Sequence, residues 1–569
     1  MDYQRILIFM GLAVTGYLLM LAWQEDYGQQ STRAQVESST NRTTDALPSE
    51  PAVSTRDSSS QAVSSDTFIP NVDAAPTAAP SASRPNTVHV QTDVFSIDID
   101  LRGGDIVSLA LPEYPAALVE PDRPLKLIDS GNQYVSQSGL IGPNGTDKNG
   151  ARPDYRTSAK TFELKAGQSE LEVVLTPTFP DESGVRISKI FTFKPQDYLI
   201  DVRYEIINGS NSPVNMAFFG QIKRDGRPPL FQVDNAMGLQ PYLGIATRTQ
   251  EDLYDKIDLS DLEDGPYQQD FTGGYIAFLQ HYFLSAWVPL QSDSVRYYAR
   301  ALNVTDEPAQ NLYTLGFTSS VLTVAQGGRG QLGGSFYAGP KNQTTLAEIS
   351  KGLDLTVDYG FLWFIAQPLF SALTWIHSLV NNWGFAIILL TVCVKTLLYP
   401  LSAASFKSMA KMRKLQPEMV RLKERFGEDK QKFSQAMMEL YKKEGANPLG
   451  GCLPILLQMP VFLALYWTLM ESVELRHAPF ILWIDDLSVM DPFFVLPILM
   501  GISMYLTQMM QPEPPDPVQA KVFKFMPIIF TVFFLWFPSG LVLYWLINNI
   551  LSVLQQLYVT RQLENAPRA

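Results

Sequence analysis

The sequence predicts a polytopic α-helical membrane protein that carries a large antiparallel β-sandwich domain outside the membrane. Apolar runs long enough to cross a bilayer gather in the last third of the 569 residues, after a single run near the N-terminus. Between them, about 250 residues form short alternating runs bounded by Gly, Pro, Asn and Asp, a pattern typical of strands. One lysine, Lys395, lies inside an apolar run, where insertion costs roughly 2.5 to 3.5 kcal/mol and needs a functional or structural reason.

The composition excludes several classes of function. The 44 basic and 57 acidic residues give a net charge of −13, which argues against nucleic acid as the main partner. The two cysteines, Cys393 and Cys452, both lie in apolar runs, where sulfur behaves as a small hydrophobe, so we expect no disulfide scaffold. No zinc-binding spacing is visible, and we expect neither a metal nor a cofactor.

The N-terminal part is expected to be an anchor followed by a tether. The run Ile6–Trp23 is longer than a usual signal-peptide core, and Leu21-Ala22-Trp23 offers no small-x-small cleavage site. We therefore interpret residues 1–23 as a transmembrane anchor, with a cleaved signal peptide as the alternative. Residues 24–86 are mainly Ser, Thr, Ala, Pro and Gln, which cannot bury enough surface to order, so we expect a disordered linker.

Residues 87–351 are expected to form the β-sandwich. Its strand candidates are Val94–Leu101, Ile106–Leu111, Leu171–Thr176, Val185–Phe193, Tyr198–Ile207, Tyr275–Val288, Val295–Val304 and Leu312–Val324. So many strands without helical patterns between them indicate an antiparallel sandwich. The domain contains acidic residues and two histidines, His89 and His281, but no nucleophile elbow or phosphate loop. Its charges are interpreted as a solvated surface, and a carbohydrate-active β-sandwich is the alternative.

Residues 352–382 are expected to lie at the membrane surface. The run Phe361–Val380 is apolar enough to span. If it did, the basic segment that follows the next run would fall on the side of the β domain, against the positive-inside tendency. An interfacial amphipathic helix anchored by Trp363, Phe370 and Trp375 removes the conflict.

Residues 383–560 are expected to form the membrane core, with a cytoplasmic tail at 561–569. The six predicted spans are Ile6–Trp23, Trp383–Leu401, Gly451–Met470, Pro492–Met510, Phe525–Phe537 and Leu541–Val559. Pro538-Ser539-Gly540 supplies the turn between the last two, and the short fifth span suggests a locally thinned bilayer. Six spans put both termini in the cytoplasm and the β domain outside. The loop after Leu401 carries eleven Lys and Arg against six Asp and Glu, and the loop after Met470 is acidic, which agrees with this orientation.

Residues 403–446 are expected to form a cytoplasmic helical hairpin. Apolar residues recur at spacings of three and four, the first helix stops at Phe426-Gly427, and Pro417 sets a kink or a fresh helix start. The methionines that could contact substrate are Met409, Met412, Met419, Met437 and Met438. Flexible thioether side chains repack around varied hydrophobic partners. The alternative is that the apolar stripe only holds the two helices together.

A polar face recurs on several predicted spans. Thr391 and Lys395 share one helix face, Gln458 lies in the third span, and Trp545 and Asn549 share a face of the last. Such faces indicate a hydrated cavity within the membrane. The alternative is that Lys395 extends to the headgroups along its own helix. No Asp or Glu lies in any predicted span and no inverted repeat is visible, which weakens the further alternative of a small-solute transporter.

Four motifs carry a resemblance to a known family. They are Asn447-Pro448-Leu449-Gly450-Gly451-Cys452, Gln458-Met459-Pro460, Leu482-Trp483-Ile484 and Phe534-Leu535-Trp536-Phe537-Pro538-Ser539-Gly540-Leu541. At these residues the chain resembles the YidC family of membrane protein insertases, from about Phe361 to Val559. The N-terminal anchor and large β domain are similar to the Gram-negative branch, in which the periplasmic domain has a supersandwich fold similar to that of sugar mutarotases.

The resemblance implies an insertase and chaperone for new inner-membrane proteins, acting alone or with the Sec translocon and without enzymatic chemistry. It implies a five-helix core around a groove that is open to cytoplasm and lipid and closed toward the periplasm. The family's groove arginine aligns with Lys395, which keeps the charge without the guanidinium fork, and its polar and aromatic positions align with Thr391, Gln458 and Trp545.

The implied partners are nascent membrane proteins, the Sec translocon with its accessory subunits, membrane lipids and the ribosome. The tail after Thr560 carries only Arg561 and Arg568, so we do not expect it to tether a ribosome through a basic tail.

Overall fold

The computed structural model describes residues 86–147, 150–178, 184–229, 241–303, 305, 310–426, 429–444, 453–511 and 517–565. The predicted anchor 1–23, all but the last residue of the predicted linker and the motif 447–452 lie outside these ranges. Chain contacts divide the protein into two compact units. Apart from the first residues of one helix, 517–523, everything described below belongs to the unit Ser64–Glu513 with Lys524–Ala569.

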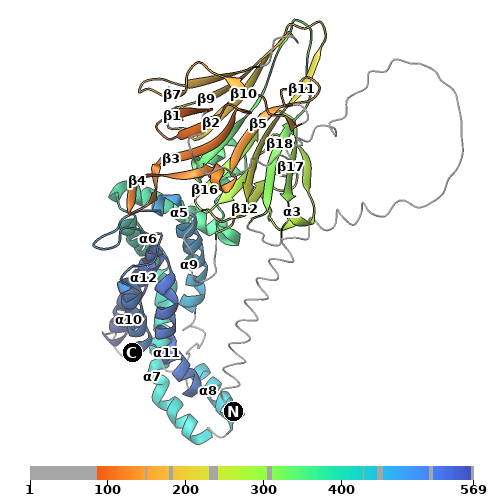
Figure 1. Ribbon diagram of the computed structural model, residues 1–569. Coiled ribbons are helices and arrows are strands. Elements are labelled where there is room, and N and C mark those ends of the chain that lie inside the picture. The colour runs from red at the N-terminus through yellow and green to blue at the C-terminus, as the bar shows by residue number, and fades with distance from the viewer. Residues whose placement is uncertain are drawn as a thin grey trace, which may run out of the picture. The chain divides into compact units, whose positions relative to one another are not determined.

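Two large sheets form the β domain (Figure 1). The 11-stranded sheet runs β14 (Tyr267–Thr272), β17 (Ser294–Asn303), β18 (Leu312–Ser319), β11 (Val214–Asp225), β5 (Val135–Ile141), β3 (Asp105–Ala117), β2 (Ser96–Asp100), β1 (Thr87–Gln91) and β7 (Thr161–Glu163), with β19 (Leu322–Val324) on β11 and β4 (Glu120–Asp129) on β3. The 9-stranded sheet runs β13 (Asp255–Ile257), β12 (Gly244–Thr247), β15 (Ile276–Gln280), β16 (Phe283–Pro289), β20 (Arg329–Pro340), β10 (Leu199–Asn208), β9 (Val185–Phe193), β8 (Leu171–Pro177) and β6 (Tyr155–Arg156). The described pairs are antiparallel except β1 with β7, where His89 faces Thr161 in parallel register.

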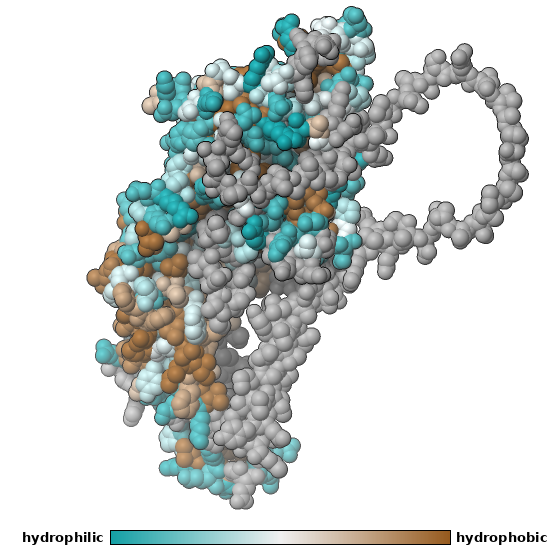
Figure 2. Space-filling view, in the orientation of Figure 1, coloured by the Kyte–Doolittle hydropathy of each residue, from teal (hydrophilic) through white to brown (hydrophobic). Residues whose placement is uncertain are grey.

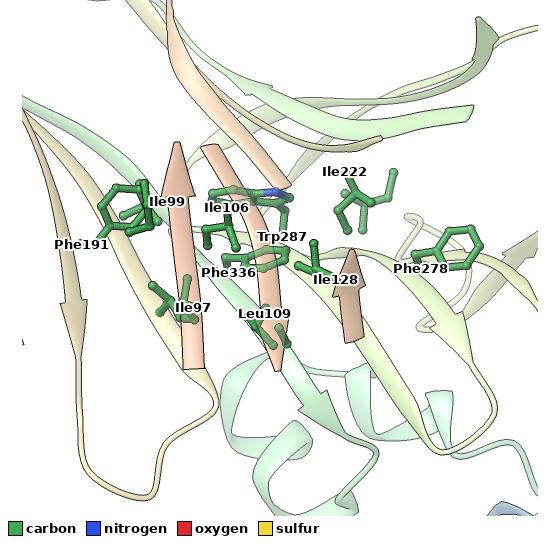
Figure 3. Close-up of a cluster of buried hydrophobic side chains, with 14 of the residues drawn as sticks. Ile97, Ile99, Ile106, Leu109, Ile128, Phe191, Ile222, Phe278, Trp287 and Phe336 are labelled. Carbon is green, nitrogen blue, oxygen red and sulfur yellow. The ribbon is translucent and has the colours of Figure 1, made fainter. Parts of the chain in front are cut away.

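One continuous apolar core lies between the sheets. Strand β2 contributes Ile97 and Ile99 from one sheet, and Phe191, Trp287 and Phe336 come from the other (Figure 3). Along β2 the buried and half-buried positions alternate, as the period of a strand requires. The core is that of a sandwich.

Most of the predicted strands correspond to one strand each, and two of them break into separate strands. The strand predicted over Val185–Phe193 is confirmed residue for residue. The single strand predicted over Tyr275–Val288 is wrong, because β15 and β16 form a hairpin there. Its turn, His281-Tyr282, contains no Gly, Pro, Asn or Asp, and the two rings stack at 3.7 Å and are buried. The prediction over Leu312–Val324 likewise breaks into β18 and β19.

Most of the helices follow the last strand in the chain. They are α3 (Asp261–Asp264) within the β domain, then α4 (Gln343–Ile349), α5 (Trp363–Val380), α6 (Trp383–Leu397), α7 (Tyr399–Phe426), α8 (Lys430–Lys443), α9 (Leu453–Glu471), α10 (Val495–Met509), α11 (Pro517–Phe533) and α12 (Ser539–Asn565). Short 3-10 turns are η2 (Ser130–Asn132), η6 (Leu353–Thr356), η7 (Gly360–Leu362), η9 (Val473–Leu475) and η10 (Phe534–Trp536). A second apolar core joins α5, α6, α9, α10 and α12.

The second predicted span is shorter than expected. Helix α6 ends at Leu397, and α7 leaves it at an angle of 67°. The physical reason is Pro400, which has no N–H for the carbonyl four residues earlier and sterically opposes a continuous helix. Tyr399–Leu401 therefore belongs to the first helix of the hairpin. That helix continues through Pro417, so the predicted alternative of a fresh start there is wrong. Its second half is held in place because Met419 accepts a hydrogen bond from Tyr441 of α8.

The surface of the C-terminal helices is strongly apolar. Ile498, Ile502 and Leu506 lie at four-residue spacing on α10 and are half or more exposed. Figure 2 shows hydrophobic side chains gathered over this part of the chain. Within the described residues, Ser539–Leu563 alone is long and apolar enough to cross a membrane, α6 with α7 qualifies as a bent pair, and α10 is a shorter apolar helix. The count of six spans stays a prediction.

Candidate functional site

Lys395 lies where α6 meets α9 and α12. Its Nζ donates to Ser552 Oγ at 2.7 Å and to Gln458 Oε1 at 3.4 Å. Gln458 in turn donates to Asn548, and Ser552 Oγ donates to the backbone oxygen of Asn548 at 2.8 Å. The side chain is only 7% exposed. Lys395 therefore bonds inward to two neighbouring helices, α9 and α12.

The bonds to Lys395 solvate its charge without neutralising it. Both partners are neutral oxygens. The backbone oxygen of Lys395 accepts a third bond, from Gln555 Nε2 at 3.3 Å. A buried cation with neutral partners is held in place, yet its field remains available to a carboxylate that approaches it.

Thr391 and Trp545 flank this network in different ways. Thr391 is buried, and its Oγ1 donates to the backbone oxygen of Ile387 in the same helix at 2.6 Å. Trp545 lies among aromatic rings of α9 and η10, with Phe462 edge-on at 4.4 Å and Phe534 at 5.3 Å. Its buried Nε1–H has no hydrogen-bond partner among the described residues.

Asn549 points to a different neighbour. Its Nδ2 donates to Ser503 Oγ of α10 at 3.1 Å, and Gln556, two turns along, donates to the backbone oxygen of Met510. Helix α12 therefore has two polar stripes. The first, Asn548, Ser552 and Gln555, faces α6 and α9, and the second, Asn549 and Gln556, faces α10. Of the predicted set, the structure joins Lys395 to Gln458 and places Asn549 in the second stripe.

Sequence reasoning missed Asn548 and Ser552. The signal was present, because residues 545, 548, 552 and 555 recur at spacings of three and four and so share one face of a helix. Trp545 and Asn549 satisfy the same periodicity, so spacing alone does not select between the two faces.

The hairpin methionines do not form one surface. Met409 is buried against Phe406 and Val559, and Met419 is buried beside α8. Met412 and Met437 are half-buried, whereas Met438 is 64% exposed. The apolar stripe thus supports packing at two positions and leaves three accessible to a ligand.

Buried charged side chains in the β domain form hydrogen bonds or ion pairs within that domain. Arg152 bonds Asp105 and also Asp147, at 2.5 Å to the latter. Lys189 Nζ donates to three backbone oxygens, of Gly103, Gly104 and Ser138, and burial lowers the pKa of this lysine to about 7. The half-exposed His89 bonds Asp98 at 2.8 Å. These contacts tie strands together, and no group of three or more metal-ligating side chains occurs among the described residues.

The end of α9 contacts the β domain through buried polar groups. His281 Nε2 lies 2.8 Å from Met470 O, and burial lowers the pKa of the imidazole to about 3. A neutral imidazole donates through Nε2–H to that carbonyl. Lys341 Nζ lies 3.3 Å from a carboxylate oxygen of Glu471, and both side chains are buried.

Comparisons with known proteins cover nearly the whole chain. A family described as "60Kd inner membrane protein" matches residues 375–566, and one described as "YidC periplasmic domain" matches residues 87–372. The protein named "Membrane protein insertase YidC" of Pseudomonas fluorescens (strain SBW25) is 48% identical over 569 residues, covering 100% of this chain and 99% of that protein. The protein of the same name from Pseudomonas syringae pv. syringae (strain B728a) is also 48% identical, with the same coverage of both chains.

Solved structures of low identity also match. A crystal structure titled as an active YidC insertase with its first transmembrane domain resolved has 20% identity and a TM-score of 0.38, covering 83% of this chain and 92% of that one. YidC from Thermotoga maritima has 16% identity and a TM-score of 0.30, covering 82% and 99%. A galactose mutarotase-like protein from Lactobacillus casei has 10% identity and a TM-score of 0.32, covering 45% and 99%.

Proposed function

This chain belongs to the YidC family of membrane protein insertases, and we propose that it inserts its substrates through the polar site around Lys395. It is an insertase of the inner membrane with a periplasmic β-sandwich domain and a helical C-terminal part, and its substrates are newly made membrane proteins. The comparisons favour this function over a carbohydrate-active protein or a small-solute transporter. The sites, the topology and the other partners are our proposals.

We propose six spans, with both termini in the cytoplasm. The division is an anchor at 1–23, a linker at 24–86, the β domain at 87–351, an interfacial region at 352–382, a core at 383–560 and a tail at 561–569. Support for the interfacial region comes from α5, where Trp363 and Trp375 are both more than half exposed. Indole rings favour the boundary between headgroups and acyl chains.

The proposed mechanism uses electrostatics and lipid partitioning, without bond-making chemistry. The hairpin α7–α8 receives the substrate, with Met412, Met437 and Met438 as contact residues and Met409 and Met419 supporting the hairpin. Lys395 attracts acidic residues of the segment to be translocated, and Thr391, Gln458, Trp545 and Asn549 line or brace a hydrated groove beside it. Insertion is driven by burial of roughly 20 apolar substrate residues in lipid.

Further partners follow from the same proposal. We propose that the chain works both alone and with the Sec translocon and its accessory subunits, and that it contacts lipid along its apolar helix surface. Contact with the ribosome would run through the basic hairpin, because the segment after Leu401 carries eleven Lys and Arg against six Asp and Glu.

The observation that carries the proposal is the buried Lys395 with neutral partners on two other helices. The test is protease protection of a newly synthesised two-span protein added to liposomes with and without the purified full-length chain. Protected fragments that require the chain support the insertase mechanism. Saturable uptake of small solutes in the same vesicles without protected fragments would instead support a transporter.

A further inference from the structure

The loop between α9 and α10, residues 472–494, folds back onto the helical bundle. Ile484 and Leu487 are buried in the apolar core that joins the helices. The loop is tied to itself, since Leu487 N donates to Ala478 O at 3.1 Å. Phe480 packs against Gly384 at the start of α6 so closely that a Cβ on that glycine would collide with the ring. The loop is therefore part of the packed bundle and not a free connection.

The same loop satisfies the first turn of α12. Ser539 N and Ser539 Oγ both donate to Val489 O at 2.7 Å, and Gly540 N donates to Leu487 O at 2.9 Å. Met490 and Pro538 form an antiparallel bridge beside these bonds. The first N–H groups of a helix have no partner within it, so the loop supplies the acceptors that α12 needs at this end.

One buried carboxylate fastens the loop to α10. Asp491 is 1% exposed, and its Oδ1 accepts from the indole Nε1 of Trp483 at 3.0 Å and from Phe493 N at 3.0 Å. Its Oδ2 accepts from Leu496 N at 2.7 Å. Two backbone donors at the start of α10 and one side-chain donor from the middle of the loop thus meet on a single charged acceptor, the strongest kind of hydrogen bond available here.

The other end of the loop is held by the β domain. Val473 belongs to the core of the sandwich, and Arg476 Nη2 donates to the backbone oxygens of Pro115 and Ala116 in β3, at 2.8 and 3.2 Å. Because that domain is periplasmic, the loop lies at the periplasmic end of the bundle.

We propose that Asp491 is the positioning residue that latches residues 472–494 onto the periplasmic end of the helical bundle. The β domain braces this loop through Val473 and Arg476. The inference rests on the proposed function, because a polar site that hydrates from the cytoplasm needs a seal on the opposite side. The loop lies at that side, where it packs against the start of α6 and is bonded to the starts of α10 and α12.

Thiol labelling from the periplasmic side tests the latch. The parent is the full-length chain with Cys393→Ser, Cys452→Ser and a reporter, Thr391→Cys, placed one turn from Lys395. Asp491→Asn replaces one accepting oxygen by an NH2 group that faces N–H donors. Spheroplasts are treated with a membrane-impermeant maleimide, and the labelling rate of the reporter is measured.

We expect Asp491→Asn to raise the labelling rate about tenfold to a hundredfold, the range set by losing hydrogen bonds to a charged acceptor. The matched control is Asp485→Asn, which removes the same charge from an exposed position of the same loop and should leave the rate unchanged. Trp483→Phe keeps the ring, removes one donor and should give a smaller rise. Thermal unfolding in detergent identifies any variant that has lost its fold.

Equal labelling of folded Asp491→Asn, Trp483→Phe and the parent would overturn the latch. The insertion assay runs in parallel and separates the two proposals. Insertion without any change in labelling contradicts the latch alone, whereas a labelling change in a chain that inserts nothing contradicts the proposed function alone.

Discussion

Replacing Lys395 by methionine should impair insertion selectively while leaving the fold nearly intact. A substrate carboxylate about 5 Å from the ammonium gains about 3 kcal/mol at an effective dielectric constant of about 20. That energy corresponds to a factor of about a hundred in local binding, since about 1.4 kcal/mol is tenfold. Hydration of the groove lowers this value, and we expect insertion of a substrate with an acidic translocated segment to fall at least about tenfold.

The stability of Lys395→Met follows from the partners that the lysine leaves behind. Ser552 keeps its bond to Asn548 O, and Gln458 keeps its bond to the Asn548 side chain. The Oε1 atom of Gln458 loses its donor, at a cost of about 1 to 3 kcal/mol. Removing a buried cation gives back several kcal/mol of desolvation. The two effects oppose each other, so the free energy of unfolding should change by less than about 2 kcal/mol.

The assay is protease protection in proteoliposomes with two substrates that differ only in acidic or neutral residues of the translocated segment. Lys407→Met is the control, because it removes the same charge from an exposed position on α7. Equal loss for both substrates, or equal loss in the control, would refute the electrostatic role of Lys395.

Three further predictions concern stability. Burial holds the pKa of His281 near 3, against about 6.5 in the unfolded chain, so the unfolded state binds an extra proton between these two pH values. Thermal stability should therefore fall as pH drops from about 6.5 to 4, by at most about 1.4 kcal/mol per pH unit. His281→Gln should flatten this dependence. Breaking the buried pair with Lys341→Met should cost about 3 to 5 kcal/mol, and adding Glu471→Leu should recover most of it in a double-mutant cycle by chemical unfolding. Trp545→Phe should keep stability within about 1.5 kcal/mol, because the indole N–H has no partner to lose among the residues that the structure describes, whereas Trp545→Ala should cost about 3 to 5 kcal/mol. A loss of insertion in the folded Phe variant would show that the N–H contacts substrate.

The strands and helices that follow local periodicity could be predicted from sequence. The strand Val185–Phe193 is an example, since alternation and flanking turn residues define it. The hairpin at His281-Tyr282 could not be, because its turn is stabilised by ring stacking and by contact with Met470, 189 residues away. Local signals contain no information on such a distant contact.

The candidate site likewise contains residues that local sequence predicts and residues that only tertiary packing identifies. Lys395 and Gln458 could be singled out because a polar residue in an apolar run is conspicuous by composition alone. Their partners on α12, Ser552 for Lys395 and Asn548 for Gln458, lie in a helix with so many polar residues that spacing permits two faces. Only the packing of α12 against α6, α9 and α10 decides which face meets the lysine.

The two polar stripes of α12 affect the order in which the helices of the bundle assemble. This helix is the last of the described helices to leave the ribosome, yet it carries the partners of Lys395, Gln458 and Ser503 on the earlier helices α6, α9 and α10. Until it arrives, water or headgroups must replace the bonds that Ser552, Asn548 and Asn549 supply, because lipid tails offer no hydrogen bonds. Assembly of the bundle is therefore coupled to the synthesis of α12, and a chain truncated before Ser539 would lose the polar contacts of three helices at once.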